Sequence, residues 1–256
     1  LICGDVGFGK TEVGIRAAMK AVLDGRQVAV LVPTTILAEQ HQISFRKRME
    51  EHGAIVECLS RFRSTKESND IIARTEKGGV DVLIGTHRLL NKKVKFRDLG
   101  LLVVDEEQRF GVTHKEKIKK LKNDIDVLTL SATPIPRTLQ MSLLGIRDLS
   151  IIATPPIRRS PVRTETGPFD DERVRKALKE EHQRGGQSFV VCPRIDDLEP
   201  MGRRIAELVP DQRVVTLHGK MKADEVEDAM LAFSNGDYEI LLATTIVESG
   251  LDLPSA

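Results

Sequence analysis

Residues 4–11 read Gly-Asp-Val-Gly-Phe-Gly-Lys-Thr, which fits the G-x-x-x-x-G-K-T pattern of a phosphate-binding loop. Such a loop requires a β-strand before it and an α-helix after it. The apolar residues 1–3 can end that strand, and residues 12–24 carry apolar side chains at helical spacing. A chance glycine-rich turn is the alternative, but it does not account for this setting. The stretch therefore predicts a strand–loop–helix unit that binds a nucleoside triphosphate.

The loop offers three kinds of group to a phosphate. Its glycines take backbone conformations that other residues resist, so backbone N–H groups can point inward. The helix that follows adds the positive end of its dipole. Lys10 supplies a mobile positive charge for the β- and γ-phosphates, and the Thr11 hydroxyl is placed to bind Mg²⁺. The predicted nucleotide-binding residues of the loop are Gly4, Asp5, Val6, Gly7, Phe8, Gly9, Lys10 and Thr11.

An apolar run over residues 101–104 ends in the carboxylates Asp105 and Glu106. At the tip of a buried strand, Asp105 can hold Mg²⁺ through water. Glu106 points elsewhere because strand side chains alternate, and it becomes a candidate to orient or deprotonate an attacking water. Taken alone, the pair could be an acidic surface turn. Beside a phosphate loop, we interpret it as the catalytic half of the same site.

Residues 131–134, Ser-Ala-Thr-Pro, follow a further apolar strand. The hydroxyls of Ser131 and Thr133 could hydrogen-bond the acidic pair and sense the loss of a phosphate. An ordinary helix cap, before a helix opened by Pro134, is the simpler explanation when the segment is taken alone.

Apolar runs of strand length alternate with amphipathic stretches along the first 150 residues. Strands that are apolar throughout and alternate with helices predict an α/β fold, a parallel sheet with helices on both faces. Ligands of such sheets sit at the carboxyl ends of the strands, where the motifs fall. We expect strands at 27–33, 54–60, 80–86, 100–106 and 126–131, and helices at 36–49, 65–77, 115–122 and 137–143.

Residues 154–161 carry three prolines and two arginines, and this composition indicates a linker. A second alternating set follows, with helices expected at 170–183, 199–208 and 223–233 and strands at 187–193, 213–218 and 239–244. We therefore predict two domains, 1–153 and 165–256, joined by a linker at 154–164. Both ends look cut, since the first strand is short and a further strand is expected at the end. The sequence indicates a piece of a longer protein with an incomplete second domain.

Several predicted loops at one rim of the sheet suit a sugar-phosphate backbone. Hydroxyl groups at strand ends and helix starts can contact phosphates, and arginine adds charge. Each loop alone is more often plain capping chemistry, but their common position favours a backbone track. The net charge of +1 and an aromatic content of 4% argue for local contacts rather than a base-stacking surface. The residues assigned to nucleic acid on these loops are Thr34, Arg61, Arg63, Thr86 and His87.

Other features of the sequence exclude whole classes of protein. No apolar run approaches the roughly 18–20 residues of a membrane span, and no signal-peptide pattern opens the chain. The three cysteines are far apart and lack metal-ligand spacing, which favours reduced, buried thiols in a cytoplasmic protein.

His218 is best explained as structural. The lysine-rich stretch 115–122 is best explained as a solvated helix face, with DNA contact as the alternative.

The motifs in order resemble the superfamily-two helicases and translocases: the phosphate loop, Pro33-Thr34-Thr35, the Gly-Thr-His of residues 85–87, Asp105-Glu106, the Ser-Ala-Thr of 131–133 and residues 244–252. Within that group the chain is similar to the bacterial transcription-repair coupling factors and to RecG-type branch-migrating helicases. Residues 105–112 and 131–138 resemble both. Three segments, 8–12, 60–64 and 147–156, favour the coupling factors, and the resemblance runs along essentially the whole chain.

This resemblance implies two RecA-like domains that hydrolyse ATP with Mg²⁺ and track double-stranded DNA. Lys10, Thr11, Asp105 and Glu106 would perform the phosphate chemistry, and Ser131 with Thr133 would couple it to domain motion. Gly250 and Asp252 would meet the nucleotide from the second domain, and Thr34, Thr86, His87 and Thr244 would lie along DNA. The whole protein would displace stalled RNA polymerase and recruit excision-repair proteins through other modules.

Two alternatives remain open at this stage. A RecG-type helicase would move branched junctions rather than polymerase. Alternatively, the chain by itself is a nucleotide-binding module with little turnover, because the last motor motif of the family, with its Gln and paired Arg residues, is expected beyond Ala256.

Overall fold

The computed structural model describes residues 1–111, 113–114, 116, 118, 125–132, 148–156, 164–244 and 256. The chain divides into two compact units, Leu1–Ser160 and Pro161–Ala256, which are treated separately below. The helices expected at 137–143 and, for the most part, at 115–122 lie outside the described residues, as do Thr133, Gly250 and Asp252.

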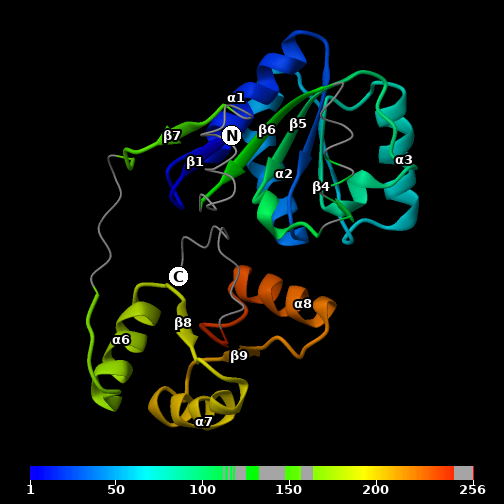
Figure 1. Ribbon diagram of the computed structural model, residues 1–256. Coiled ribbons are helices and arrows are strands. Elements are labelled where there is room, and N and C mark those ends of the chain that lie inside the picture. Colours follow the sequence, from blue (N-terminus) through cyan, green and yellow to red (C-terminus); the bar gives the residue numbers. More distant parts are fainter. Residues whose placement is uncertain are drawn as a thin grey trace. The chain divides into compact units, whose positions relative to one another are not determined.

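The described part of the first unit is built on a seven-stranded sheet with every strand pair parallel (Figure 1). The strand order is β3-β4-β2-β5-β6-β1-β7. The strands are β1 (Ile2–Gly4), β2 (Gln27–Leu31), β3 (Val56–Leu59), β4 (Val82–Gly85), β5 (Leu99–Asp105), β6 (Asp126–Ser131) and β7 (Ser150–Ile152). The helical segments are α1 (Lys10–Leu23), α2 (Thr35–Met49), η1 (Glu50–His52), α3 (Thr65–Glu76), η2 (His87–Leu90) and η3 (Glu107–Arg109).

Helices cover both faces of this sheet. On α1, a Cβ added at Gly14 would lie 3.6 Å from Val103 and 3.4 Å from Leu130, so this helix packs closely on one face. On α3, Ile71 belongs to a buried cluster with Leu102. Because successive strand residues point to opposite faces, Leu102 and Val103 place α3 and α1 on opposite sides.

Local capping sets where these helices start. The Thr34 hydroxyl accepts a hydrogen bond from the N–H of Leu37 at 3.3 Å and opens α2. Ser64 and Glu67 form a reciprocal capping box at α3, with Ser64 N–H to Glu67 at 2.8 Å and Glu67 N–H to the Ser64 hydroxyl at 3.2 Å. These bonds lower the pKa of Glu67. Side-chain caps thus satisfy backbone donors that a helix start leaves unpaired.

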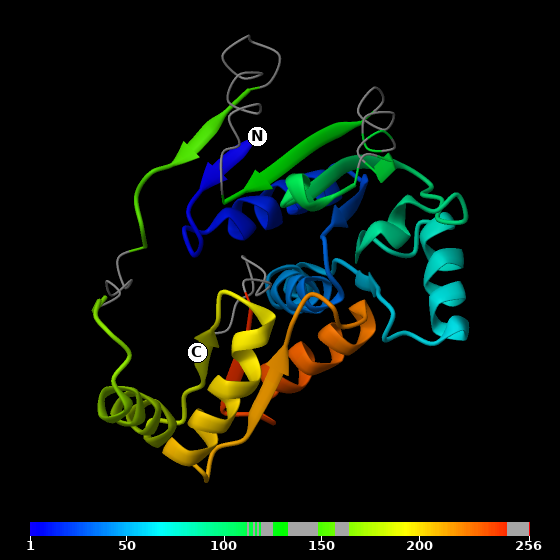
Figure 2. The same ribbon diagram turned by 60° about the horizontal axis from the view of Figure 1, so that its bottom comes forward.

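The described part of the second unit has a three-stranded parallel sheet in the order β8-β10-β9 (Figure 2). Phe189 on β8 packs against Phe233 of α8, with ring centroids 5.4 Å apart and ring planes tilted by 51°. The neighbouring Val190 instead packs with Ile205 of α7, so α7 and α8 cover opposite faces. The elements are α6 (Asp171–Gln183), β8 (Ser188–Val191), η4 (Ile195–Asp197), α7 (Leu198–Leu208), β9 (Val214–Leu217), α8 (Ala223–Ser234) and β10 (Ile240–Ala243).

A glutamine performs the same structural task in each unit. The side-chain amide of Gln27 donates to the carbonyls of Thr75 at 3.0 Å and Val80 at 2.7 Å. These two hydrogen bonds connect the end of α3 with the residues that precede β4. The side-chain amide of Gln187 donates to the carbonyls of Phe233 at 2.6 Å and Tyr238 at 2.7 Å. These two hydrogen bonds connect the end of α8 with the residues that precede β10. The two units therefore share a structural detail that their sequences do not reveal as a repeat.

The predicted fold class is confirmed: parallel sheets flanked by helices form both units. None of the helices within the described ranges has the length and apolar character that a membrane crossing requires.

Candidate nucleotide and nucleic-acid site

The strand order brings the three phosphate-chemistry motifs together. Strands β5, β6 and β1 are neighbours, and they lead into Asp105, Ser131 and the phosphate loop respectively. Because all three strands are parallel, their carboxyl ends lie at one edge of the sheet. Only β6 separates β5 from β1, so those two strands are about 10 Å apart. Groups distant in sequence are thus within reach of one nucleotide.

The phosphate loop has the backbone shape that its glycines predict. Gly7 and Gly9 have φ values of 78° and 87°, in the left-handed region that glycine tolerates. Helix α1 starts at Lys10, and the N–H of Glu12 donates to the Gly9 carbonyl at 3.1 Å. The Lys10 ammonium donates to the carbonyls of Gly4 at 2.8 Å and Asp5 at 3.1 Å. The loop therefore carries a flexible positive charge at the start of a helix.

Glu106 has an unusual backbone conformation for a residue with a side chain. Its φ of 50° and ψ of 52° make it the one non-glycine with positive φ among the described residues. Its side chain is buried, accepts a hydrogen bond from the N–H of Ala132 at 3.2 Å, and accepts another from the Gln108 amide. A left-handed conformation at a buried carboxylate is a strained arrangement of the kind that is concentrated at functional sites.

The Ser-Ala-Thr segment reaches the acidic pair through Gln108 and through a backbone N–H. The Ser131 hydroxyl lies 3.5 Å from the Gln108 oxygen, at the limit of a hydrogen bond. The neighbouring N–H of Ala132 is the direct partner of Glu106. Gln108 continues the acidic pair in sequence, as expected of a site residue, whereas the role of the Ala132 N–H depends on the proximity of two strand ends.

Asp105 ends β5 with its side chain 12% exposed. Its Oδ2 lies 3.2 Å from Nε2 of His41, a buried residue of α2. The sequence does not reveal this role of His41, because a contact between residues 41 and 105 leaves no local pattern, although His41 lies shortly after the Pro-Thr-Thr segment.

The second half of the sheet carries the loops assigned to nucleic acid. Strands β3, β4 and β2 are adjacent and lead into residues 60–64, Thr86 and Thr34. Thr34 caps α2, Thr86 is buried, and His87 is exposed with its ring 5.3 Å from that of His114. The predicted track residues of the first unit thus follow three neighbouring strands, as a continuous track requires.

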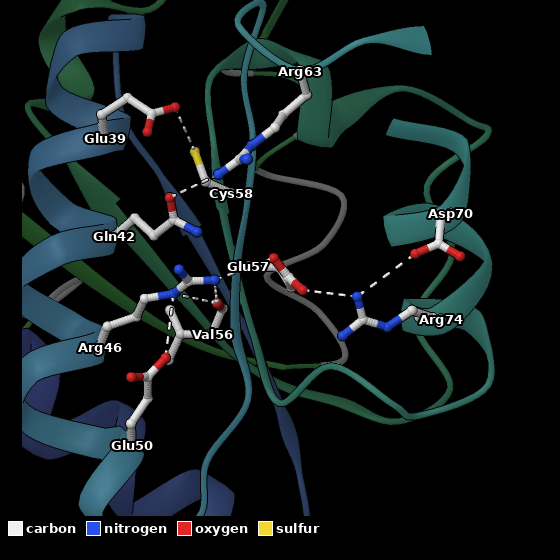
Figure 3. Close-up of polar contacts among 10 residues, drawn as sticks. All are labelled: Glu39, Gln42, Arg46, Glu50, Val56, Glu57, Cys58, Arg63, Asp70 and Arg74. Atoms are coloured by element: carbon white, nitrogen blue, oxygen red, sulfur yellow. Dashed lines mark hydrogen bonds and ion pairs between the residues drawn. The ribbon is translucent and has the colours of Figure 1, made fainter. Parts of the chain in front are cut away.

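The two arginines of the 60–64 loop lie in different surroundings. The Arg61 guanidinium sits 5.3 Å from the centroid of the half-exposed Phe62 ring. The Arg63 side chain instead reaches inward, and its Nη2 lies 3.3 Å from Gln42 of α2 (Figure 3). The Arg63 side chain therefore packs between the 60–64 loop and α2.

Side chains join these loops into one unit. The Glu39 carboxylate accepts from the Ser60 hydroxyl at 2.8 Å, and Arg88 donates to the Ser60 carbonyl at 2.6 Å. Beside them, burial and then the Glu39 charge raise the pKa of the Cys58 thiol to about 12 (Figure 3). A Cβ at Gly85, the last residue of β4, would lie 2.8 Å from the carbonyl of its β3 partner Leu59, so the two strand ends can approach this closely only with glycine there. Loop positions along this half of the edge are therefore coupled.

In the second unit, Thr244 is buried at the end of β10, and its N–H donates to the Leu217 carbonyl at 3.2 Å. His218, which the sequence analysis assigned a structural role, follows β9.

Comparison with protein-family models matches both units of the chain. A DEAD/DEAH box helicase model matches residues 1–142, and a helicase conserved C-terminal domain matches residues 171–256. The chain belongs to the DEAD/DEAH box helicases. The resemblance to superfamily-two helicases is thereby confirmed, and membership in the family implies nucleotide binding.

Individual relatives agree with this family assignment. The chain is 54% identical over 255 residues to a transcription-repair-coupling factor of Bacillus subtilis and 52% identical over 256 residues to one of Escherichia coli. Each match covers 100% of the chain and 22% of the relative, so the chain spans about a fifth of these proteins. A solved structure of RecG bound to a three-way DNA junction matches all of the chain and 34% of RecG, with 34% identity and a TM-score of 0.82.

Proposed function

We propose that this DEAD/DEAH box helicase is the ATP-driven motor segment of a translocase that moves along double-stranded DNA. The observation that carries the proposal is the order β5-β6-β1, which gathers the phosphate loop, the acidic pair and the Ser-Ala-Thr segment at one edge. The DNA substrate is inferred from two relatives, one named a transcription-repair-coupling factor and the other a RecG bound to a three-way DNA junction.

The residues at this edge fit a nucleotide bound with Mg²⁺. Mg²⁺ is usually held by one or two carboxylates together with substrate phosphates and water, so it does not need a cage of protein ligands. Among the described residues, no group of three or more His, Cys, Asp or Glu side chains forms such a cage. Asp105 and Thr11 would hold the ion, which when bound neutralises phosphate charge. Lys10 and the N–H groups of residues 4–11 would bind the phosphates.

Glu106 is the proposed general base. Its buried carboxylate is fixed by Ala132 and Gln108, so it can hold an attacking water in a defined orientation and accept its proton. Ser131 and Thr133 would transmit the loss of the terminal phosphate to the rest of the motor, and Gly250 and Asp252 of the second domain would contact the nucleotide. These four assignments come from the family resemblance.

The other half of the edge is proposed to bind the DNA backbone. Thr34, Thr86, His87 and Arg61 would contact phosphates from neighbouring loops, and Thr244 would do so from the second domain. Arg63 would support the loop from behind, given its contact with Gln42.

Within a whole protein, the motor would displace stalled RNA polymerase and promote nucleotide excision repair, as the coupling-factor relatives' name suggests. The second candidate is a RecG-type activity on branched junctions, favoured by the RecG structural match. The two candidates can be distinguished in a chimera, in which this chain replaces the matching 255 residues of the Bacillus subtilis transcription-repair-coupling factor. Displacement of a third strand from a triplex and release of stalled polymerase support the first candidate. Junction unwinding without polymerase release supports the second.

A nucleotide-binding module with little turnover is the remaining alternative for the chain by itself. If Glu106→Gln left the slow ATP turnover of the isolated chain unchanged, this alternative would be favoured, because a working base cannot be replaced without loss.

A further inference from the structure

The first unit's sheet has two functional halves that meet at one strand pair. Strands β5, β6 and β1 carry the phosphate-chemistry motifs, whereas β3, β4 and β2 carry the loops assigned to nucleic acid. The boundary runs between β2 and β5. Helix α2 follows β2, and His41 on this helix reaches Asp105 at the end of β5. A side chain from the nucleic-acid half thus contacts the proposed metal ligand.

The His41 ring is held tightly in place. It is buried, its Nδ1 lies 2.9 Å from the Leu37 carbonyl one helical turn earlier, and it stacks on Phe45 with centroids 6.2 Å apart and planes 22° apart. A carbonyl oxygen only accepts, so Nδ1 is the donor in that bond. These contacts leave the ring little freedom to rotate, which fixes the direction of Nε2.

Nε2 makes no hydrogen bond to any described residue, and Oδ2 of Asp105 lies 3.2 Å away from it. Two buried atoms 3.2 Å apart are in direct contact in a close-packed interior, so each limits how far the other can move. A shift of α2 therefore moves Nε2 against the carboxylate, and a shift of the carboxylate is resisted by the ring.

A second contact links α2 to the nucleotide half, but it is weaker. Arg48 of α2 pairs with Glu12 of α1 at 2.7 Å, with side chains 53% and 37% exposed. Exposed ion pairs contribute little because solvent screens them. The buried His41–Asp105 contact, with side chains 8% and 12% exposed, is therefore the stiffer of the two links.

We propose that His41 is a positioning residue for Asp105, which holds the carboxylate in the orientation that binds Mg²⁺ with the nucleotide. The proposal rests on the proposed function, because it takes Asp105 as the metal ligand. Outer-shell partners of this kind typically change metal affinity by roughly 10–100-fold when removed.

Two polar variants distinguish the contact of the residue-41 side chain with Asp105 from its packing against Phe45. His41→Asn keeps a donor near the Nδ1 position for Leu37 but cannot reach Asp105. His41→Gln places its amide near the Nε2 position. Phe45→Leu is the packing control, because it loosens the stack beneath the ring without removing a polar group. All are made in the 256-residue chain.

The readout is binding, with no turnover required. Mn²⁺ affinity in the presence of ADP is measured by electron paramagnetic resonance, and a fluorescent ADP analogue is titrated at varied Mg²⁺. We expect His41→Asn to weaken the metal affinity by roughly 10–100-fold, and His41→Gln and Phe45→Leu to stay within about threefold of the unmodified chain. In an Asp105→Asn background, His41→Asn should cause no further loss, since the two residues act through one contact.

The outcomes distinguish this proposal from the proposed function. Metal-independent nucleotide binding by the unmodified chain would overturn the assignment of Asp105 itself. Metal-dependent binding that His41→Asn leaves unchanged would overturn only the role of His41. Equal losses in His41→Asn and His41→Gln, or an equal loss in Phe45→Leu, would also overturn it, because packing would then set the affinity.

Discussion

The Glu106 carboxylate accepts the N–H of Ala132 at 3.2 Å, across 26 residues of sequence. The bond joins the end of β5 to the end of β6, and the Gln108 amide contacts the same carboxylate. The proposed base is thereby attached to the segment proposed to sense phosphate loss. A change in one segment cannot leave the other untouched.

Replacing Glu106 by Gln should slow ATP hydrolysis by roughly 10²–10⁴-fold, the usual range for a general base, because the amide cannot accept the proton. Nucleotide affinity should change little, since the phosphates are bound elsewhere. Single-turnover hydrolysis and equilibrium binding in the chimera check both parts. Glu76→Gln, an exposed change of the same charge on α3, is the control. A matching loss of affinity would argue that Glu106 holds nucleotide instead.

Replacing Lys10 by Ala should weaken nucleotide binding by roughly 10–100-fold, the effect of a lost charge-assisted hydrogen bond. The fold should survive, because within the described part of the chain the ammonium donates hydrogen bonds to the carbonyls of Gly4 and Asp5 and to no other group. Isothermal titration calorimetry and circular dichroism measure the two properties. Lys20→Ala, at the far end of the same helix and 83% exposed, is the matched control. Equal affinities for Lys10→Ala and Lys20→Ala would refute the assignment.

Most elements could be predicted from sequence, since their signals are local. The prediction for β6, residues 126–131, matches the structure, and the helix expected at 36–49 begins one residue earlier because Thr34 caps it. Strand β7 was not predicted: its three residues form a strand only by pairing with β1, and Ile151 is 66% exposed, so no buried pattern marks it.

The candidate site could be predicted only as far as its motifs. The phosphate loop and acidic pair carry sequence patterns. Gln108 directly continues the acidic pair and could be assigned with it. His41 and the N–H of Ala132 gain their positions from the strand order, which sequence does not display. The pattern also placed Arg61 and Arg63 together, although their side chains lie in different surroundings.

Gln27 and Gln187 should each stabilise their own unit. Gln27→Leu leaves the carbonyls of Thr75 and Val80 and the N–H groups of Arg97 and Asp98 without their partner, and should cost about 2–4 kcal/mol. Gln187→Leu should act in the same sense on the second unit. Hydrogen exchange localises the effects: faster exchange should appear in β2 and β4 for the first variant and in β8 and β10 for the second. Unchanged exchange in both would contradict this role.

Arg61 and Arg63 should respond differently to alanine. Arg61→Ala should weaken duplex binding and lower the slope of log affinity against log salt by about one, the value for one lost phosphate contact. Arg63→Ala should mainly lower stability, because it removes the contact with Gln42. Salt-dependent DNA binding and thermal melting of the chimera separate these effects. Arg26→Ala, at the opposite edge of the sheet beside Asp98, is the charge control. A slope changed by Arg63→Ala alone would reverse the assignment.

Cys58 should remain a thiol far into the alkaline range. Its pKa rises from 9.0 to about 12 because burial, and then the charge of Glu39, disfavour the thiolate. Since the folded-state pKa is the higher one, the stabilising contribution is complete below pH 9 and is lost as the pH rises towards 12. The difference in thiolate absorbance between the unmodified chain and Cys58→Ser should show a transition near pH 12 in the folded protein and near 9 in urea. A folded-state transition near pH 9 would show that the thiol is solvated.

The most direct test of the account is steady-state ATP hydrolysis by the chimera with and without duplex DNA, compared with the isolated chain and with the natural Bacillus subtilis protein. The account predicts hydrolysis by the chimera that duplex DNA stimulates and that Glu106→Gln slows by roughly 10²–10⁴-fold. A chimera that folds and binds nucleotide, but whose hydrolysis ignores DNA while the natural protein responds, would contradict the claim that this chain is a DNA motor.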